Sequence, residues 1–169
     1  MRHVLPDVLK PGLDVVFCGT AAGGRSAREG AYYAHPGNKF WRVLFEAGLT
    51  PHLMRPADFP RLPEFGIGAT DLCKTQSGRD RAIDAFDVPA FERKIRRFAP
   101  RAVAFTSKTG ASIWLGVSTG KLHYGLQPAR AGFPAVFVLP SPSGAAAGHW
   151  TVEPWRELGT WIRERRSSR

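Results

Sequence analysis

The sequence has few cysteines and no long apolar run. Only Cys18 and Cys73 occur among 169 residues, which is too few for a four-ligand metal site or a disulfide framework. We expect two buried core thiols and no metal. No run of about 18 apolar residues could span a membrane, and the N-terminus lacks the charged and apolar segments of a signal peptide. These absences predict a cytoplasmic protein that does not contact membranes.

The sequence also lacks the usual nucleotide-binding motifs. The small-residue stretch 19–24 reads Gly-Thr-Ala-Ala-Gly-Gly, which misses the G-x-G-x-x-G spacing of dinucleotide-binding turns. No Gly-Lys-Ser/Thr of a P-loop follows it. We therefore expect no organic cofactor.

Acidic residues are in the minority. Asp and Glu number 14 against 24 Lys and Arg, which gives a formal charge of +10. An excess of this size in a small domain indicates a polyanionic partner such as nucleic acid. Part of the charge has a simpler interpretation as a basic, solvated C-terminal tail from about residue 163, with Arg163, Arg165, Arg166 and Arg169. The remainder still favours a nucleic-acid partner.

Length and patterning predict one α/β domain over residues 1–169, present as a monomer. With 43% hydrophobic residues, the chain can bury one substantial core. Apolar runs alternate with helical patterns, which favours a three-layer α/β/α sandwich around a mostly parallel sheet. Four prolines make 51–63 a loop. The predicted strands are 14–19, 66–72, 102–106 and 135–139, and the predicted helices are 38–48, one from about 89, 108–115 and 153–165.

Each predicted strand ends in small or polar residues. The four ends are Gly19-Thr20, Thr70-Asp71, Thr106 to Lys108 and Ser141 to Ser143. Ligands of open α/β sheets bind at the carboxyl ends of the strands, where the strand order reverses. The sequence therefore predicts that these four segments form one crevice.

Two motifs resemble the uracil-DNA glycosylase superfamily, most closely its mismatch-specific uracil and thymine-DNA glycosylases. Residues 34–41 read Ala-His-Pro-Gly-Asn-Lys-Phe-Trp, similar to the family signature Ala-His-Pro-x-Asn-Arg/His-Phe-Trp. Residues 140–147 read Pro-Ser-Pro-Ser-Gly-Ala-Ala-Ala and resemble, with substitutions, the family's second motif near the last strand. The resemblance extends over residues 15–161.

The resemblance implies how a base flipped out of DNA would be held. The ring of Tyr33 would stack on the base. The loop residues around it would meet the edges of the base, namely Gly19, Thr20, Ala21, Gly23 and Ser141. Contacts with the DNA backbone would come from Ser26, Lys39, Lys108, Ser143, Gly144 and His149. The implied partner is uracil-containing DNA.

The chain departs from the family at two places. The mismatch-specific enzymes have Gly-Ile-Asn-Pro-Gly where residues 19–23 read Gly-Thr-Ala-Ala-Gly, so Ala21 replaces the catalytic asparagine. The hypoxanthine-type branch also lacks that asparagine. After the second motif, Ala145 and Ala147 stand where those enzymes carry a bulky residue and an arginine that fill the gap left by the flipped nucleotide. We therefore expect a weak grip on duplex DNA and on the abasic product.

Two residues are candidates for the missing catalytic group. The Asn38 amide could contact the base or a water molecule, although Asn is also a good helix cap. Asp71 could orient or deprotonate water, although it could equally be a turn residue at the end of a strand. Asp80 and Asp84 lie in a polar, Arg-containing loop and are interpreted as solvated charges.

The sequence predicts a monofunctional uracil-DNA glycosylase of base excision repair, which flips uracil out and hydrolyses its N-glycosidic bond. One alternative is a non-catalytic module that binds uracil or a damaged base in DNA, and the absence of asparagine at position 21 favours it. Another is a hypoxanthine-DNA glycosylase. Retention of Tyr33 and Asn38 favours the enzyme.

Overall fold

The computed structural model describes residues 2–168, which form a five-stranded sheet in the order β2-β1-β3-β5-β4. All strand pairs are parallel except β4 with β5. The strands are β1 (Val15–Gly19), β2 (Ile67–Asp71), β3 (Ala102–Phe105), β4 (Gly125–Leu126) and β5 (Ala135–Val138). The α-helices are α1 (Gly24–Glu29), α2 (Phe40–Glu46), α3 (Val88–Phe98), α4 (Lys108–Leu115) and α5 (Glu153–Ser167). Short 3₁₀ helices are η1 (Pro56–Phe65), η2 (Asp80–Ala82), η3 (Thr119–Lys121) and η4 (Gly144–His149).

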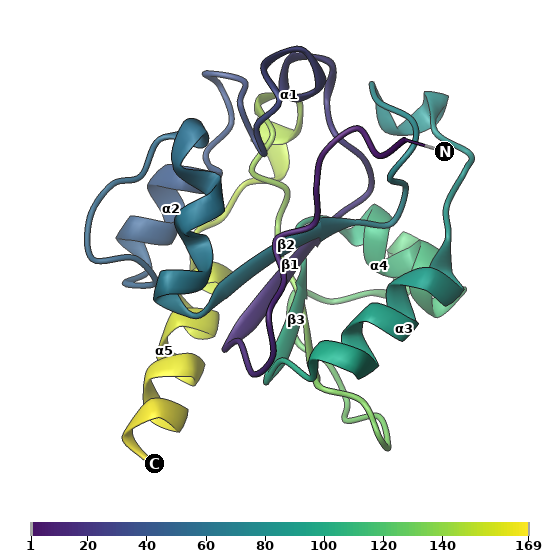
Figure 1. Cartoon of the computed structure of the whole chain (residues 1–169). Coiled ribbons are helices and arrows are strands. Elements are labelled where there is room, and N and C mark those ends of the chain that lie inside the picture. The colour runs from purple at the N-terminus through teal and green to yellow at the C-terminus, as the bar shows by residue number, and fades with distance from the viewer. Residues whose placement is uncertain (1, 169) are drawn as a thin grey trace.

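Helices cover both faces of the sheet. Side chains of a strand alternate between faces, so Val15 and Phe17 of β1 pack in one cluster and Val16 and Cys18 in another. The first cluster includes residues of α2 and α5, and the second includes residues of α3 and α4, which lie on opposite sides of the sheet (Figure 1). The predicted α/β fold with a mostly parallel sheet is confirmed.

The predicted strand boundaries agree closely with the structure, but the prediction for one segment was wrong. All four predicted strands form, each within one residue of its expected bounds. The segment 51–63 was predicted to be a loop, but its second half belongs to η1, with Pro60 and Pro63 inside it. A 3₁₀ helix of few turns tolerates proline better than an α-helix does because it has fewer internal N–H bonds to lose. The helix α1 and the edge strand β4 were not predicted.

The basic C-terminal residues are tied to the domain up to residue 167. They belong to α5, where Arg163 donates to the carbonyl of Ala47 at 2.8 Å. Arg166 donates to the buried Asp14 carboxylate at 2.9 Å and pairs with it. The expectation of a solvated tail is therefore wrong for these residues, since a buried carboxylate requires a cation. Arg169 lies outside the described residues.

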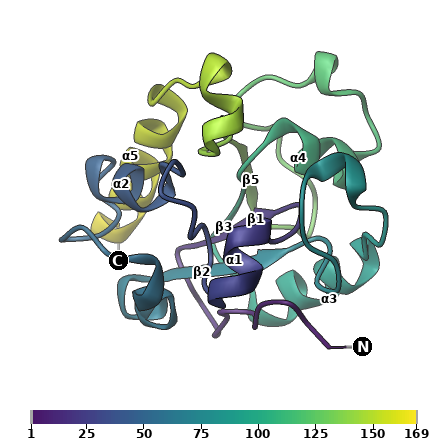
Figure 2. The same cartoon turned by 90° about the horizontal axis from the view of Figure 1, so that it is seen from above.

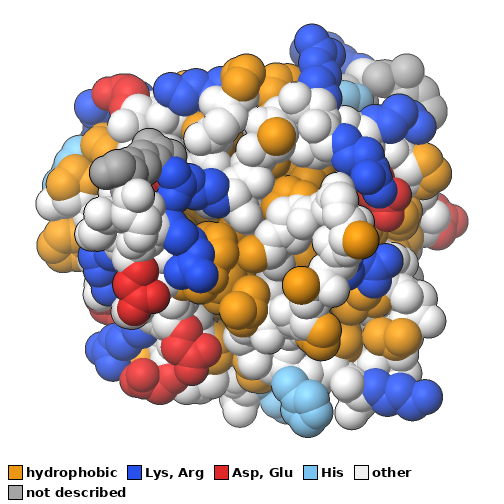
Figure 3. Space-filling view, turned by 90° about the horizontal axis from the view of Figure 1, so that it is seen from below, with side chains coloured by type: hydrophobic (Ala, Val, Ile, Leu, Met, Phe, Trp, Pro, Cys, Tyr) orange, Lys and Arg blue, Asp and Glu red, His pale blue; other side chains and the backbone are white. Residues whose placement is uncertain are grey.

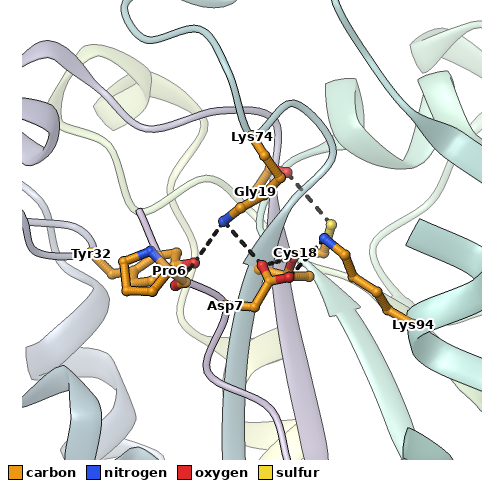
Figure 4. Close-up of polar contacts among 8 residues, drawn as sticks. Pro6, Asp7, Cys18, Gly19, Tyr32, Lys74 and Lys94 are labelled. Carbon is orange, nitrogen blue, oxygen red and sulfur yellow. Dashed lines mark hydrogen bonds and ion pairs between the residues drawn. The ribbon is translucent and has the colours of Figure 1, made fainter. Parts of the chain in front are cut away.

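A partly buried ion cluster holds the N-terminal segment against β2. Figure 4 shows Lys74 donating to Tyr32 Oη and pairing with Asp7, which also pairs with Lys94. Burial acts to raise the pKa of Asp7, but the two lysines and a hydrogen bond from Thr70 outweigh it and hold that pKa below its usual value. The cluster thereby fixes the chain that precedes β1 beside the ends of the strands.

The surface at the end of the molecule opposite α1 is neither uniformly charged nor uniformly apolar. Seen from below in Figure 3, it carries interspersed basic, acidic and apolar side chains. Among the helices of residues 2–168, none is long and apolar enough to cross a membrane. The electrostatic and structural features that indicate a ligand site lie at the other end of the sheet.

Candidate functional site

A pocket of about 750 Å³ lies at the carboxyl ends of the parallel strands. Gly19, Asp71, Thr106 and Ser141, from the ends of four strands, all contribute to its lining. The chain runs from β1 to β2 on one side and returns to β3 on the other, so the strand order reverses beside β1. The pocket therefore occupies the position at which open α/β sheets bind ligands. Its volume falls within the usual range for small-molecule sites.

Asp71 supplies a buried carboxylate to the pocket. It is the last residue of β2 and only 6% exposed. Within residues 2–168, its side chain takes part in no hydrogen bond or ion pair. Burial raises the pKa of Asp71 to about 6, an effect that the charge of Lys74 opposes. Such a carboxylate is ionised at neutral pH yet poised to accept a proton.

Gly19 allows the chain to pass close to this carboxylate. A Cβ atom at Gly19 would lie 2.6 Å from Asp71 Oδ1 and 3.5 Å from Tyr33 Oη. The Tyr33 hydroxyl forms a 3.2 Å hydrogen bond with the Thr106 hydroxyl. Burial, reinforced by Asp71, raises the pKa of Tyr33 far above that of a free phenol, so the hydroxyl stays neutral. The Asp71 carboxylate therefore lies beside neutral hydrogen-bonding groups of Tyr33 and Thr106.

Buried aromatic residues support the ring of Tyr33 from behind. It stacks on Phe40 with centroids 3.9 Å apart and planes 17° apart. Phe40 in turn makes edge contacts with Phe17 and Trp155. The backbone of Tyr33 has φ of +51°, which is uncommon for a residue other than glycine. Strain of this kind is characteristic of functional sites, where the surrounding packing maintains it.

Asn38 lines the same pocket and also shapes the chain. Its side-chain oxygen accepts a hydrogen bond from the N–H of Phe40 at 3.0 Å, so it has the turn-forming role typical of Asn. Its own N–H donates to the carbonyl of His35 at 2.9 Å. His35 Nδ1 accepts from the N–H of Gly37 at 2.9 Å. The Asn38 amide nitrogen makes no hydrogen bond within residues 2–168 and lies at the pocket.

The two family-like motifs are in direct contact. The N–H of Lys39 donates to the carbonyl of Pro142 at 2.8 Å. A Cβ at Gly144 would lie 3.3 Å from the carbonyl oxygen of Gly37, so glycine permits this close approach. In η4, the hydroxyl of Ser143 accepts from the N–H of Ala145 at 3.3 Å. The second motif is thus fastened to the first at one wall of the pocket.

Residues predicted to contact the DNA backbone are dispersed. Ser26 is buried, lines the pocket and accepts from the N–H of Ala34 at 3.0 Å, which supports the loop carrying Tyr33. Lys39 Nζ lies over the Trp150 ring at 5.4 Å, outside the lining. Lys108 Nζ lies 4.4 Å from the ring of Tyr124 and also lies outside the lining. His149, at the end of η4, and Gly144 are exposed and do not line the pocket either, whereas Ser143 does.

The loop after β1 lines the pocket through Thr20, Ala21 and Gly23, the residues for which contact with the base is a prediction. A contact that the sequence did not reveal is the 2.6 Å hydrogen bond from the Thr20 hydroxyl to Asp80. Asp80 is exposed, as expected of a solvated charge, but it also has this structural contact. Periodicity gives no sign of a contact between residues 60 positions apart.

The sequence reasoning also missed the two arginines beside Asp80. Arg79 and Arg81 both line the pocket and are exposed. The basic composition predicted a polyanionic partner but not which cations would meet it. The pattern Gly-Arg-Asp-Arg at 78–81 is the only local signal.

Metal chemistry has no obvious site within the described chain. Residues 2–168 contain no cluster of three or more His, Cys, Asp or Glu side chains that could hold an ion. Cys18 and Cys73 are both buried and are not bonded to each other. Apart from tyrosines, the ionisable side chains that line the pocket are those of Asp71, Asp80, His35, Arg25, Arg79 and Arg81.

Comparison with known families agrees with this architecture. The family model described as the uracil DNA glycosylase superfamily matches residues 6–159, which include all five strands of the sheet and every lining residue of the pocket except Leu5. The chain belongs to the uracil DNA glycosylase superfamily. Membership in this superfamily supports a DNA glycosylase that acts on DNA in repair.

A solved structure has the same fold. The solution NMR structure of a candidate uracil DNA glycosylase from Methanosarcina acetivorans has 22% sequence identity with this chain and a TM-score of 0.63. The match covers 96% of both chains. The two chains therefore share the arrangement of their strands and helices.

Proposed function

We propose that the protein is a monofunctional uracil-DNA glycosylase that excises uracil from DNA and leaves an abasic site. The observation that carries this proposal is the buried, unpartnered carboxylate of Asp71, which shares the pocket with Tyr33 and Asn38. We further propose that the chain is closest to the mismatch-specific uracil and thymine-DNA glycosylases, on the basis of the eight-residue segment 34–41.

The flipped uracil would bind against Tyr33 and the loop after β1. The face of the base would stack on the Tyr33 ring, which Phe40 supports on its other side. Backbone N–H groups of the loop 19–23 would face the carbonyl oxygens of uracil. Fixed donors of this kind stabilise the negative charge that develops on the base as the glycosidic bond lengthens.

Asp71 would act on the water that attacks the sugar. The bond between C1′ and N1 of uracil breaks, its electron pair leaves with the base, and the oxygen of water forms the new bond to C1′. The water proton passes to the Asp71 carboxylate, and the uracil anion then takes up a proton. The Asn38 amide would donate a hydrogen bond to this water or to the base. These roles compensate for the alanine at position 21.

The absence of lysine from the described lining of the pocket supports a hydrolytic reaction without lyase chemistry. An amine would be needed there to form a Schiff base with the sugar. The volume of about 750 Å³ also has room for a purine, so hypoxanthine is the second candidate base.

The test is a single-turnover assay on oligonucleotides that contain uracil, hypoxanthine or mismatched thymine, followed by alkaline cleavage. We expect alkali-labile sites from uracil substrates, and a loss of at least about 10²-fold in Asp71→Asn. An exposed-surface variant, Arg93→Ala in α3, is the control. If no base is released but base-containing DNA is still bound selectively, the protein is a binding module and the enzyme proposal is wrong.

A further inference from the structure

The rim of the pocket includes a short loop that the proposed reaction does not use. Residues 77–81 follow β2 and read Ser-Gly-Arg-Asp-Arg. Gly78, Arg79, Asp80 and Arg81 all line the pocket. Figure 2, viewed onto the carboxyl ends of the strands, shows this teal segment and the yellow-green η4 on different sides of α1. The loop therefore forms a separate wall from the one built by the second motif.

Hydrogen bonds fasten this loop to the floor of the pocket. Ser77 forms a parallel β-bridge with Ala22, and the N–H of Gly78 donates to the carbonyl of Ala22 at 2.9 Å. The Asp80 carboxylate accepts the 2.6 Å hydrogen bond from Thr20. The position of the two arginine backbones is therefore tied to the same residues 20–22 that line the pocket.

The two guanidinium groups on this loop are available to a ligand. Within residues 2–168, Arg79 and Arg81 form no ion pair, and both are exposed. Arg25, the third arginine of the pocket lining, is paired with Glu29 at 3.2 Å. Asp80, the one acidic residue between the arginines, is engaged by Thr20. Thr20 is a neutral donor, so Asp80 keeps its charge and residues 77–81 carry a net charge of +1. The loop thus presents two guanidinium groups without an ion-pair partner in the described chain, beside the opening of the pocket.

The wall built by the second motif offers little positive charge. The pocket-lining residues there are Ser141, Pro142, Ser143, Ala145 and Ala146, none of which is charged. The Ser143 hydroxyl is already used within η4. A polyanion entering the pocket would therefore find its strongest electrostatic attraction on the side of residues 77–81.

We propose that Arg79 and Arg81 form a phosphate clamp that binds the DNA backbone next to the flipped nucleotide. This inference rests on the proposed function for the identity of the ligand. Guanidinium groups bind phosphate oxygens through charge-assisted, often bidentate hydrogen bonds. The Thr20–Asp80 hydrogen bond couples the clamp to the loop that contacts the base, so the backbone and the base are positioned together. Such contacts contribute affinity and register without reading sequence.

The test measures how binding depends on salt. The probe is a duplex with a tetrahydrofuran abasic analogue, which no glycosylase can cleave, so binding is measured independently of catalysis. We expect Arg79→Ala/Arg81→Ala to lower affinity about tenfold at low salt and to reduce the slope of log K against log salt by nearly two, since each phosphate contact contributes about 0.9. Arg93→Ala/Arg97→Ala, on the exposed surface of α3, is the control with the same change in net charge.

A second double variant separates the effect of charge from an effect on folding. Arg79→Lys/Arg81→Lys keeps both positive charges and should retain most of the wild-type slope, whereas a slope as low as that of the alanine pair would overturn the clamp. Equal slopes for the alanine pair and the α3 control would also overturn it.

The outcome is distinguishable from failure of the proposed function. If the wild-type protein excises uracil but the alanine pair binds like the wild type, only the clamp is wrong. If the wild-type protein excises no base, the proposed enzyme is wrong, while a reduced slope in the alanine pair still supports the clamp.

Discussion

Gly19 and Asp71 lie so close together at the ends of β1 and β2 that a methyl group on residue 19 would collide with the Asp71 carboxylate. The two residues are register partners in the parallel sheet, and a Cβ on Gly19 would stand 2.6 Å from Asp71 Oδ1. The contact lies within the floor of the pocket, where the carboxylate cannot swing freely into solvent. The position of the candidate base therefore depends on the absence of a side chain at residue 19.

Gly19→Ala should displace the Asp71 carboxylate and lower uracil excision by about 10²-fold, the usual effect of moving a reacting group by about 1 Å. Gly120→Ala is the matched control, since nothing lies within 4 Å of a Cβ there. Single-turnover rates of both variants, with circular dichroism to verify folding, make the comparison. A Gly19→Ala protein with the wild-type rate would show that Asp71 is not positioned by this contact.

Excision should rise with pH through about 6 and then level off, because Asp71 must lose its proton to act as a base and its pKa is raised to about 6. Lys74, Lys94 and Asp7 are the charged groups that act on it. Asp71→Asn should lose this titration together with the activity. The measurement is a single-turnover rate profile between pH 5 and 8. A flat wild-type profile would exclude Asp71 as the base.

The same carboxylate should reduce stability as pH rises. The unfolded chain releases the Asp71 proton near pH 3.8 and the folded protein near pH 6, so between these values the folded state binds more protons and the free energy of unfolding falls with pH. Above pH 6, the free energy of unfolding of Asp71→Asn should be higher than that of the wild type by up to about 3 kcal/mol, since each pKa unit corresponds to about 1.4 kcal/mol. Urea denaturation at pH 4 and pH 7 tests this, and a constant difference would contradict it.

Asn38 has two functions that substitutions can separate. Asn38→Ser keeps an oxygen that can accept from the N–H of Phe40, as serine does in similar turns, but it removes the amide donor. We expect near-wild-type stability and a loss of about 10²-fold in excision. Asn38→Ala should lose the same activity and about 1 kcal/mol of stability. Normal excision by the serine variant would leave Asn38 with a structural role alone.

Tyr33→Ala should weaken transition-state binding by roughly 1–3 kcal/mol, the usual contribution of base stacking on an aromatic ring. Tyr33→Phe keeps the ring on Phe40 and loses only the hydrogen bond to Thr106, so its effect should be far smaller. Thr106→Val removes that bond from the other partner, together with the 3.4 Å hydrogen bond from Thr106 to the Cys18 carbonyl, so its effect should be at least that of Tyr33→Phe. The measurement is kcat/KM for each of the three variants. Equal losses in Tyr33→Ala and Tyr33→Phe would show that the hydroxyl of Tyr33, and not stacking by its ring, is what contributes.

Product release should be fast because η4 offers little to hold a flipped-out state. Ala145 and Ala147 are exposed and small, so they make few contacts with a gap in the base stack. Ala147→Arg should tighten binding to abasic duplex and slow turnover, and the added affinity should fade as salt rises. Persistent binding of the unmodified protein to abasic duplex over many turnovers would instead direct attention to His149 and Trp150.

The sequence determined the fold class because its signals are local. Apolar runs such as 15–19 and 102–105 predict strands that are buried on both faces of a parallel sheet. In β1, Val15 and Phe17 pack on one face of the sheet, and Val16 and Cys18 pack on the other. The small or polar residue at the end of each strand was enough to predict that the four ends meet, since parallel strands all end at the same edge. The segment 34–41 indicated the superfamily, which the family model then matched.

Only the tertiary structure decided how the site is assembled. The contact of Gly19 with Asp71, the bond of Thr20 to Asp80 and the packing of Arg166 on Asp14 join residues 52 to 152 positions apart, and none leaves a periodic trace in the sequence. The left-handed backbone of Tyr33 is likewise unexpected from its residue type. Sequence patterns report which face a residue buries, whereas a raised pKa, a strained turn and a paired or free charge depend on neighbours that folding brings together.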